Sequence, residues 1–414
     1  MSEELTYFKG THRVIAPKKT IEINQDKLKT AGITRIADIT DLDRIGLPVY
    51  TAIRPTAEYG GVSIYGGKGI SKDHAKASAM MEGFERYSAE RQDSDKTIIS
   101  SANELGKDYI DPKSLNLPKE FEKKDISDMN LEWSLAHDLI SDKDFYIPTN
   151  AIYHPYTHEN DVKSLFKSNT NGLASGNVLE EAILHGIFEV IERDAWSIFE
   201  LTHKNYSQIN LDTIESDIIN ESIEKFTSNG INIKLMDFTA DINVPTIAAS
   251  ADDTVTRDAG LLTLGIGTHL DPEVAILRAL TEVAQSRATQ INGAREDTVR
   301  ADFAREAGYE RMKRINKYYF KQEEEQTDLN DIENRSTTSI SKDLEIVKKE
   351  LVDNDIEHVL YYDLTRQELG VSVVRVIIPE MELYAIDQSR AGYRLYKKPF
   401  AQTRSSIRFS RRST

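Results

Sequence analysis

Two helical segments of the sequence carry the same pair of carboxylates. The first contains Glu82 and Glu85 in MMEGFER, and the second contains Glu189 and Glu192 in GIFEVIER. Because residues three apart share one helix face, each pair places two carboxylates side by side. Hard oxygen ligands of this kind suit Mg²⁺ rather than zinc, and Mg²⁺ usually completes its shell with water and phosphate oxygens. The two pairs therefore predict magnesium sites that bracket a triphosphate.

Each carboxylate pair is followed directly by an arginine, so that both segments read E-x-x-E-R. A third segment, LTEVAQSR, varies this pattern with Glu282, Gln285 and Arg287. Cationic side chains next to such carboxylates are suited to offsetting the charge of phosphate groups. The cations expected to do so are Arg86, Arg193, Arg287 and Lys68.

A surface ladder of ion pairs is the competing interpretation of E-x-x-E-R, because such pairs are common on exposed helices and contribute only about 0.2–0.5 kcal/mol each. The neighbours argue otherwise, since Met80 and Phe84 in one helix and Ile187 and Ile191 in the other are apolar. Two copies inside apolar helices, each after a turn rich in glycine or asparagine, favour buried acids that need a cation.

Other motifs are weaker. GVSIYGGKGI resembles a P-loop, but its spacing is broken and Gly69 replaces the required Ser or Thr. GIGTHL lacks the third glycine of a dinucleotide fingerprint. His154 and His158 have the spacing of metal ligands, but Pro155 between them indicates a loop, which disfavours a metal site. His185 precedes Glu189 by four residues, and a satisfied polar contact is the favoured interpretation.

Three long helices are predicted to position these side chains. The first runs over about 73–90 after the turn YGGVSIYGGKG, with Ser71 as its N-cap. The second runs over about 179–201, and the third over about 271–291 with Pro272 at its first position. INIKLMDFT, VPTIAASAD, LLTLGIGTHL, HVLYYDL and VSVVRVIIP read as strands. Helices alternating with strands indicate an α/β or α+β fold.

Three other regions give coarser predictions. Residues 1–60 read as short strands and turns, and 321–343 read as a mobile insertion with too few large apolar residues to join the core. From Gln388 to Thr414 the chain has eight bases and no acid. This strip reads as a solvated, partly frayed end, or alternatively as a docking strip for an acidic partner.

Composition excludes several classes of function. The 414 residues include no cysteine, which rules out disulfides, thiolate zinc sites, iron–sulfur clusters and a cysteine nucleophile in this chain. A net charge of −16 argues against broad nucleic-acid binding. No stretch approaches the roughly 20 apolar residues of a membrane helix. The opening MSEELTYFKG lacks an apolar signal core, so we expect a cytoplasmic location.

Three segments in order over about residues 60–295 resemble the signature segments of the YcaO family. They read GKGISKDHAKASAMMEGFER, TNGLASGNVLEEAILHGIFEVIERDA and GIGTHLDPEVAILRALTEVAQSR. The resemblance implies mixed sheets with acidic-motif helices around a central ATP site that has no Walker motif. By position, it implies Mg²⁺ ligands at Glu82, Glu85, Glu189 and Glu192. It implies nucleotide-site residues at Ser78, Asn177, Glu181, Arg193, Glu282, Gln285 and Arg287, with Lys68, Ser71 and Arg86 as neighbours and Arg13 and Arg54 as weaker candidates.

The same resemblance suggests how the chain is organised. We expect a strand-rich N-terminal part at 1–60, an ATP-binding core at 61–300, a variable helix with the mobile insertion at 301–345, and a C-terminal part of the fold at 346–400. A basic tail is expected at 401–414.

YcaO enzymes activate a peptide-bond oxygen by phosphorylation and differ in the nucleophile. Azoline-forming members use a side chain of the substrate peptide and often end in P-x-P-x-P, whereas this chain ends KKPFAQTRSSIRFSRRST, and no leader-binding domain precedes its first signature. Its THRVIAP and GITRIADIT segments are similar to archaeal members of methanogens. Those install thioglycine in the α subunit of methyl-coenzyme M reductase, commonly with a TfuA partner.

We therefore expect an ATP- and Mg²⁺-dependent thioamide synthetase that acts on this subunit or a peptide. It would work with a sulfide source and a TfuA-like partner, as a homodimer, without nucleic acid or membrane. An azoline-forming cyclodehydratase and a non-catalytic scaffold remain the alternatives.

Overall fold

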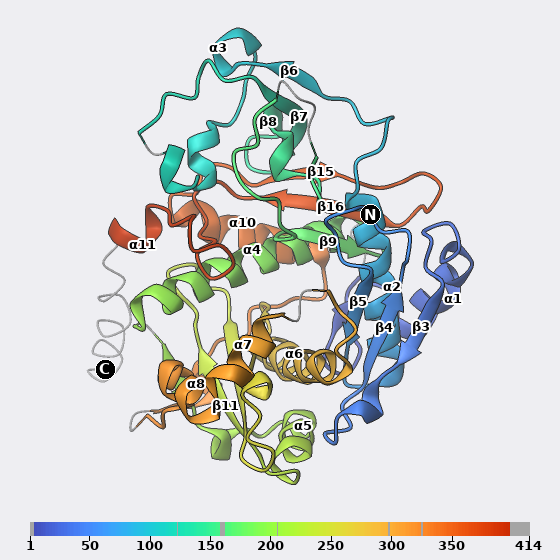
Figure 1. Cartoon of the computed structure of the whole chain (residues 1–414), viewed down its shortest axis with the longest axis vertical. Helices are drawn as coiled ribbons and strands as arrows, with labels where there is room; N and C mark the ends of the chain where they lie inside the picture. Colours follow the sequence, from blue (N-terminus) through green and yellow to red (C-terminus); the bar gives the residue numbers. More distant parts are fainter. Residues whose placement is uncertain are drawn as a thin grey trace.

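The computed structural model describes residues 4–121, 123–157, 162–204, 206–296, 299–323 and 326–397. Helices and mixed sheets build the body of the molecule, which confirms the α/β class expected from the sequence (Figure 1). No helix in these ranges combines the length and apolar character that crossing a membrane requires.

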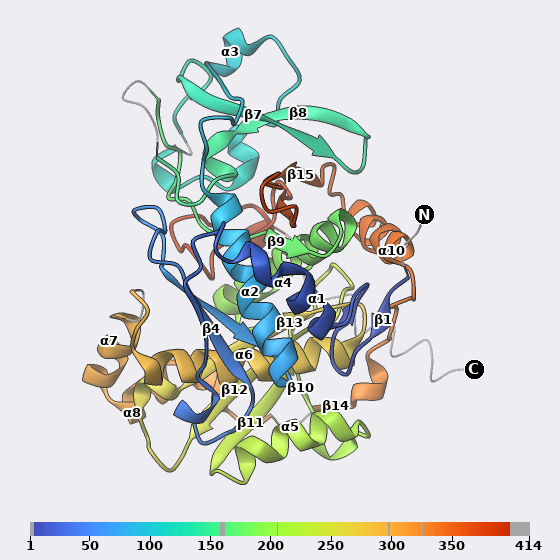
Figure 2. The same ribbon diagram turned by 90° about the vertical axis from the view of Figure 1, so that its right-hand side faces the viewer.

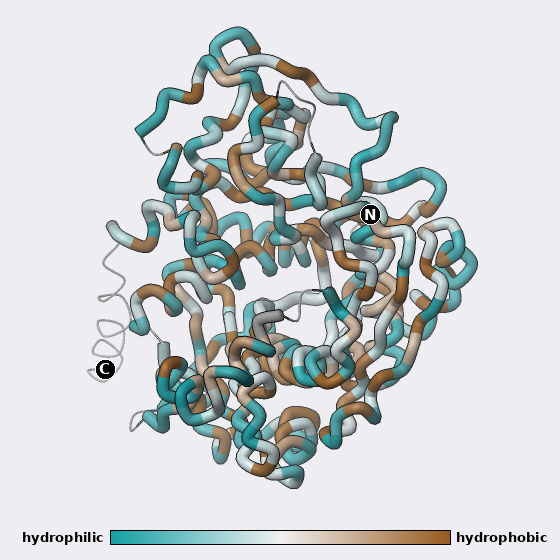
Figure 3. Tube along the Cα trace, in the orientation of Figure 1, coloured by the Kyte–Doolittle hydropathy of each residue, from teal (hydrophilic) through white to brown (hydrophobic). Residues whose placement is uncertain are grey.

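Three long helices meet in the middle of the molecule. They are α2 (Lys72–Ala89), α4 (Leu179–Thr202) and α6 (Pro272–Asn292), and Figure 2 shows α2 crossing in front of the other two. The side chain of Ser71 caps α2 by accepting the backbone N–H of His74 at 3.3 Å, as predicted. Asp271 caps α6 in the same way, and Pro272 occupies its first turn. Hydrophobic residues recur along α4 and α6 in Figure 3, as expected of helices that bury one face.

An antiparallel six-stranded sheet covers α4. Its path is β6 (Ile98–Ser100), β7 (Leu131–Asp138), β15 (Leu360–Asp363), β16 (Ser372–Ile377) and β9 (Leu173–Gly176), and β8 (Lys143–Pro148) pairs with β7. Val374 and Val376 of β16 belong to the same apolar cluster as the buried residues of α4. A Cβ at Gly186 of α4 would lie 2.6 Å from Cγ2 of Val376, so only glycine allows this close approach.

Two further sheets carry the other long helices. The order β13 (Thr263–Thr268), β12 (Thr246–Asp253), β11 (Ile231–Asp237), β10 (Ser207–Ile209) and β14 (Gln326–Thr327) forms a five-stranded sheet that packs on α6. The three-stranded sheet β3 (Arg35–Asp38), β4 (Val49–Ile53) and β5 (Ile64–Lys68) packs on α2. Each of these two sheets therefore supports a helix that carries candidate acids.

The remaining elements are short and lie around this centre. They are β1 (Thr6–Tyr7), β2 (His12–Arg13), α1 (Pro17–Asn24), α3 (Ala102–Leu105), α5 (Asp217–Thr227), α7 (Val299–Ala307), α8 (Tyr309–Ile315), α9 (Lys317–Phe320), α10 (Ile340–Asp353) and α11 (Arg394–Lys397). Strands and turns alone were predicted for residues 1–60, so α1 is a correction. Pro17 starts it at a favourable first-turn position, and Ile21 is buried.

The prediction that 321–343 stays outside the core is wrong for part of its described residues. Gln326 and Thr327 form β14, which pairs in parallel with β10 at the edge of the five-stranded sheet. Leu329 and Ile332 pack against the apolar cluster beneath α6. A few apolar residues are enough to attach this segment, because they pack against an apolar surface formed by other parts of the chain.

The basic strip also begins inside the fold rather than in solvent. Arg394 forms ion pairs with Asp194 at 2.9 Å and Asp241 at 2.6 Å. Arg390 is 3% exposed and lies over the ring of Phe166 at 3.8 Å. These two arginines correct the interpretation of a solvated strip from Gln388, whereas the tail predicted at 401–414 lies outside the described residues.

Candidate functional site

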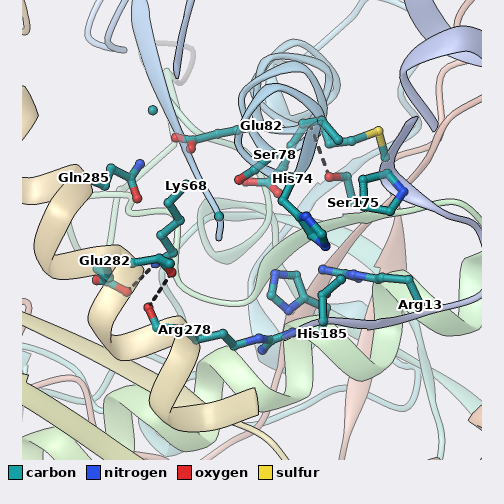
Figure 4. A pocket seen from close by; sticks show the side chains of 18 of the residues that line it. Arg13, Lys68, His74, Ser78, Glu82, Ser175, His185, Arg278, Glu282 and Gln285 are labelled. Carbon is teal, nitrogen blue, oxygen red and sulfur yellow. Dashed lines mark hydrogen bonds and ion pairs between the residues drawn. The ribbon is translucent and has the colours of Figure 1, made fainter. Parts of the chain in front are cut away.

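A cavity of about 380 Å³ lies where α2, α4 and α6 meet the N-terminal segment (Figure 4). Side chains from all three helices and from β2 and β5 line it. The predicted site residues that it brings together are Arg13, Lys68, Ser78, Glu82, Glu85, Arg86, Asn177, Glu181, Glu189, Glu192, Arg193, Glu282 and Gln285. Residues from distant parts of the chain therefore converge on one polar cavity.

The E-x-x-E-R pattern that α2 and α4 share gives similar contacts in both helices. Nη2 of Arg86 lies 3.3 Å from Oε1 of Glu82 and 3.8 Å from Oε1 of Glu85. Nη2 of Arg193 lies 3.9 Å from Oε1 of Glu189 and 3.5 Å from the carboxylate of Glu192. The side chains of Glu85 and Glu192 are only 11% and 10% exposed. This burial rules out a surface ladder of ion pairs.

Burial makes these carboxylates costly to ionise. It raises the pKa of Glu85 to about 8 and that of Glu192 to about 8, and it also raises the pKa of Glu189. The adjacent arginines act in the opposite direction without restoring the ordinary values. An additional cation at the cavity would remove this cost, so the chemistry of the donor set fits a divalent metal.

The arrangement of the acids fits Mg²⁺ more closely than a metal held by protein ligands alone. Among the described residues, no three His, Asp or Glu side chains converge as a ready-made metal cage. Mg²⁺ is commonly bound through one or two carboxylates plus phosphate oxygens and water. Glu82 and Glu85 on one wall, with Glu189 and Glu192 on another, offer that incomplete set of ligands.

A lysine of β5 and an acid of α6 form an ion pair in the cavity lining. Nζ of Lys68, at the end of β5, donates to Oε2 of Glu282 at 2.6 Å (Figure 4). Burial acts to raise the pKa of Glu282, but Lys68 and Arg193 lower it overall, so this acid is held ionised. Gln285 lies one helical turn along α6 and completes this side of the cavity.

A hydrogen-bonded group fixes the wall near the N-terminal segment. Oε1 of Glu181 lies 3.3 Å from Nη1 of Arg13 and accepts the amide of Asn177 at 2.9 Å. Its other oxygen accepts the backbone N–H of Val14 at 3.0 Å, and Thr20 donates to Oδ1 of Asn177 at 2.9 Å. Arg13, a weaker candidate in the sequence, is thus part of the site.

Three predicted nucleotide-site residues do not line the cavity. Arg287 is fully buried in ion pairs with Asp43 at 2.8 Å and Asp253 at 3.0 Å. Ser71 serves as the cap of α2. Arg54 pairs with Glu90 at 3.0 Å. The expected role of Arg287 in offsetting phosphate charge is therefore corrected, because Asp43 and Asp253 already use its guanidinium. Ser71, expected as a neighbour, and Arg54, a weaker candidate, lie outside the cavity lining.

Helix geometry explains the error at Arg287. Arg86 and Arg193 follow the first glutamate of their segments by four residues, which brings them onto the same helix face. Arg287 follows Glu282 by five residues, so it points away from the acid and toward the other side of α6.

One residue that lines the cavity, Arg278, was missed by the sequence analysis. Arg278 lies four residues before Glu282 on α6, and its Nη1 donates to the carbonyl of Thr268 at 3.0 Å. Burial lowers the pKa of Arg278 to about 10, yet the guanidinium stays charged at neutral pH. The i, i+4 spacing from Glu282 was the available signal.

His185 also differs from expectation. It lines the cavity, and its Nδ1 has no hydrogen-bond partner among the described residues, so the predicted satisfied contact is wrong. Burial holds its pKa well below the usual range, which keeps the imidazole neutral. His154 accepts or donates a 3.1 Å hydrogen bond to Ser168, and His158 lies outside the described residues.

Comparisons with known proteins agree with this geometry. The sequence model of the family described as YcaO cyclodehydratase, ATP- and Mg²⁺-binding, matches residues 66–382. An uncharacterized protein of Methanothermobacter thermautotrophicus is 52% identical over 383 residues, covering 92% of this chain and 98% of its own. An uncharacterized protein in the tfuA 3′ region of Rhizobium leguminosarum bv. trifolii is 30% identical over 381 residues, covering 90% and 89% of the two chains.

Solved structures show the same fold. The structure of YcaO from Methanopyrus kandleri bound with AMPPCP and Mg²⁺ is similar with a TM-score of 0.77 and 26% identity, covering 94% of this chain and 98% of that one. A heterocyclase in complex with substrate and cofactor has a TM-score of 0.83 at 24% identity, and covers 96% of this chain and 56% of its own.

Proposed function

This chain belongs to the YcaO family of ATP- and Mg²⁺-dependent enzymes that modify backbone amides, and on that premise we propose that it is a peptide thioamide synthetase. In the proposed reaction, hydrogen sulfide adds to an amide carbon of the substrate, and the amide oxygen takes the γ-phosphoryl group of ATP. Loss of this oxygen as inorganic phosphate leaves the thioamide and ADP. Sulfur thus replaces oxygen, and the reaction requires neither an oxidant nor a reductant.

The convergence of four glutamates with cations in one cavity carries the proposal, and two of these acids are buried while the other two are half-buried. Glu82, Glu85, Glu189 and Glu192 would hold Mg²⁺, which supplies charge neutralisation for phosphoryl transfer. Lys68, Arg193 and Arg278 stand on the walls as cations for phosphate oxygens. Because this chain contains no cysteine, positioning and electrostatic stabilisation would supply most of the rate.

Two observations support sulfide as the nucleophile. The relative from the methanogen Methanothermobacter spans nearly the whole chain at 52% identity, and another relative is encoded in a tfuA 3′ region. We propose a glycine of the methyl-coenzyme M reductase α subunit as the substrate, with a TfuA-like partner and a separate sulfide source. Homodimer formation and a cytoplasmic location stay predictions.

Azoline formation is the second candidate, and a specific observation favours it. The matching family is described as a cyclodehydratase, and a heterocyclase shares the fold over nearly all of this chain. In that reaction a side chain of the substrate peptide would replace sulfide, and water would be lost from the peptide.

Mass spectrometry of a glycine-containing substrate peptide tests both candidates. The peptide is incubated with the enzyme, ATP, Mg²⁺ and sulfide, and Glu192→Gln serves as the inactive control. Exchange of oxygen for sulfur raises the peptide mass and supports the thioamide synthetase. A mass lowered by one water in a peptide containing Cys, Ser or Thr supports the cyclodehydratase, and absence of ATP turnover with any substrate supports a non-catalytic scaffold.

A further inference from the structure

Two arginines beside the metal carboxylates have hydrogen-bonding atoms that nothing in the described part of the chain satisfies. Nε and Nη1 of Arg86, and the same two atoms of Arg375, are shielded from solvent and have no partner there. Oδ1 of Asn171 is buried and unpartnered in the same way. Arg375 as a whole is only 5% exposed. Burying charged donors without partners is unfavourable, so this arrangement calls for an anion.

The strand register shows why Arg375 faces this region. Val374 and Val376 point toward α4, so Arg375 between them points to the opposite face of β16. That face meets α2, because Val373 of β16 shares an apolar cluster with Phe84 of α2. Figure 2 shows β9, the partner of β16, lying beside α2.

The loop that contains Asn169 and Asn171 contacts the guanidinium group of Arg375. Nη2 of Arg375 donates to Oδ1 of Asn169 at 3.4 Å, and the backbone N–H of Asn171 donates to the same oxygen at 3.0 Å. Ser175, which follows in β9, donates to the carbonyl of Met81 at 3.3 Å and ties this loop and strand to α2. The loop and β9 are therefore tied both to Arg375 and to α2, the helix that carries Arg86.

The charges around the two arginines are close enough to affect one another. Burial is the larger cause that lowers the pKa of Arg375 to about 10, and the Arg86 guanidinium lowers it further while Glu189 acts in the opposite direction. His154 adds no positive charge, because burial and both arginines lower its pKa to about 4. Glu85 and Glu189 would hold Mg²⁺ in the loaded enzyme, and they would then offset the two guanidinium groups less. The need for an anion is then greatest.

We propose that Arg86 and Arg375, together with Asn171, form an oxyanion niche that holds inorganic phosphate next to the metal carboxylates. A guanidinium fork suits the oxygens of a phosphate, and Oδ1 of Asn171 would accept the hydroxyl of hydrogen phosphate. The inference rests on the proposed function, in which the amide oxygen departs as phosphate. Arg86 lines the cavity and Arg375 does not, so the proposed niche would lie at the margin of the reaction site.

Phosphate binding to the full-length protein tests the niche. Inorganic phosphate is titrated by calorimetry into the wild type, Arg375→Met and Arg375→Lys, each saturated with Mg²⁺ and ADP. Loss of charged hydrogen bonds should weaken phosphate binding about ten- to a hundredfold in Arg375→Met, with a smaller loss in Arg375→Lys. The affinity for ADP should change less than about twofold, since Arg375 does not line the cavity. Arg366→Lys is the matched control, because Arg366 is also buried but pairs with Asp95 outside the niche.

The outcomes separate the niche from the proposed function. Phosphate binding that is equal in the wild type and both Arg375 variants would overturn the niche, even if ADP and Mg²⁺ bind normally. Failure of the wild type to bind ADP with Mg²⁺ would instead overturn the proposed function. A parallel titration with acetate distinguishes the source of the anion. If acetate binds as tightly as phosphate and only its binding depends on Arg375, the niche serves a peptide carboxylate and the phosphate assignment falls.

Discussion

Arg287 on α6 and Arg86 on α2 differ in how many of their hydrogen-bond donors have a partner within the protein. Arg287 on α6 donates to Asp43 at 2.8 and 3.2 Å, to Asp253 at 3.0 Å and to the carbonyl of Leu261 at 3.4 Å. Arg86 on α2 reaches Glu82 at 3.3 Å, while its Nε and Nη1 have no partner in the described residues. The first arrangement is complete within the fold, whereas the second leaves donors for a ligand.

The same contrast holds for the acids. Asp43 and Asp253 form ion pairs with Arg287 inside the protein. Glu85 and Glu192 instead stay largely protonated at neutral pH, because burial raises their pKa more than the neighbouring arginines lower it. Buried charge therefore has two uses in this molecule, one for stability and one for binding. Completeness of partnering, rather than burial alone, distinguishes them.

Glu85→Gln and Glu192→Gln should have the largest effect and act on function alone. Each substitution removes a Mg²⁺ ligand, so ATP turnover should fall by at least about 1000-fold, equivalent to about 4 kcal/mol of transition-state stabilisation. The apo protein should not be destabilised at neutral pH, because burial already keeps these acids largely protonated there and glutamine is their uncharged counterpart. Initial rates of phosphate release and thermal unfolding measure the two effects. Turnover at the wild-type rate in both variants would contradict the magnesium assignment.

Local signals made the helical framework predictable. Ser71 and Pro272 mark the starts of α2 and α6, and the apolar runs that follow fix the helices themselves. The carboxylate pairs were also visible, because spacing on one helix determines which side chains are neighbours. That the pairs on α2 and α4 bracket one site was predicted from their repetition in two apolar helices, and the family resemblance supported it. The division of the chain at 60, 300, 345 and 400 stays a prediction.

Contacts between residues far apart in the sequence could not be predicted from it. Arg394 reads as part of a charged strip because its partners, Asp194 and Asp241, lie far away in the sequence. Leu329 and Ile332 are too few to predict a core segment, yet the sheet and α6 give them a surface to cover. No periodicity carries that information, since it depends on where other elements fold.

Arg287→Met probes the completely partnered region and should act on stability alone. Removing the guanidinium leaves Asp43 and Asp253 buried with less compensation, which should cost about 3 kcal/mol of unfolding free energy. ATP affinity should stay within about twofold of the wild type. Arg44→Met is the matched control, because Arg44 also pairs with Asp253 but is 32% exposed, and it should cost less. A large loss of ATP affinity in a folded Arg287→Met protein would restore the original assignment of this residue to the nucleotide site.

The pH dependence of stability should expose the incompletely partnered acids. The pKa of Glu85 and of Glu192 is raised from 4.5 to about 8 in the folded protein. Their contribution to stability is therefore fully present below pH 4.5 and is lost as the pH rises through 8, by on the order of 2 kcal/mol. Thermal unfolding of the apo protein between pH 5 and 8.5 should show this loss, and the double variant Glu85→Gln, Glu192→Gln should show a flatter profile. Saturation with Mg²⁺ and ADP should reverse the loss in the wild type only, and a profile unaffected by either change would contradict the argument.

Asp343→Asn tests whether an unpartnered buried acid always signals a ligand, and its effect should be the smallest. Asp343 on α10 is fully buried, its Oδ1 accepts the backbone N–H of Thr337 at 2.8 Å, and its Oδ2 has no partner in the described residues. Burial raises its pKa from 3.8 to about 6, so its contribution to stability is present below pH 3.8 and is lost as the pH rises through 6. Asparagine keeps the bond to Thr337 without the charge, and should stabilise the protein at pH 7.5 by about 1 kcal/mol while making no difference at pH 4. Chemical denaturation at the two pH values measures this change, and ATP turnover should be unaffected because Asp343 does not line the cavity. Lower stability at pH 7.5, or lost turnover, would mean that this isolated acid is held for a partner after all, and that unpartnered charge marks binding sites more widely in this molecule than the cavity alone.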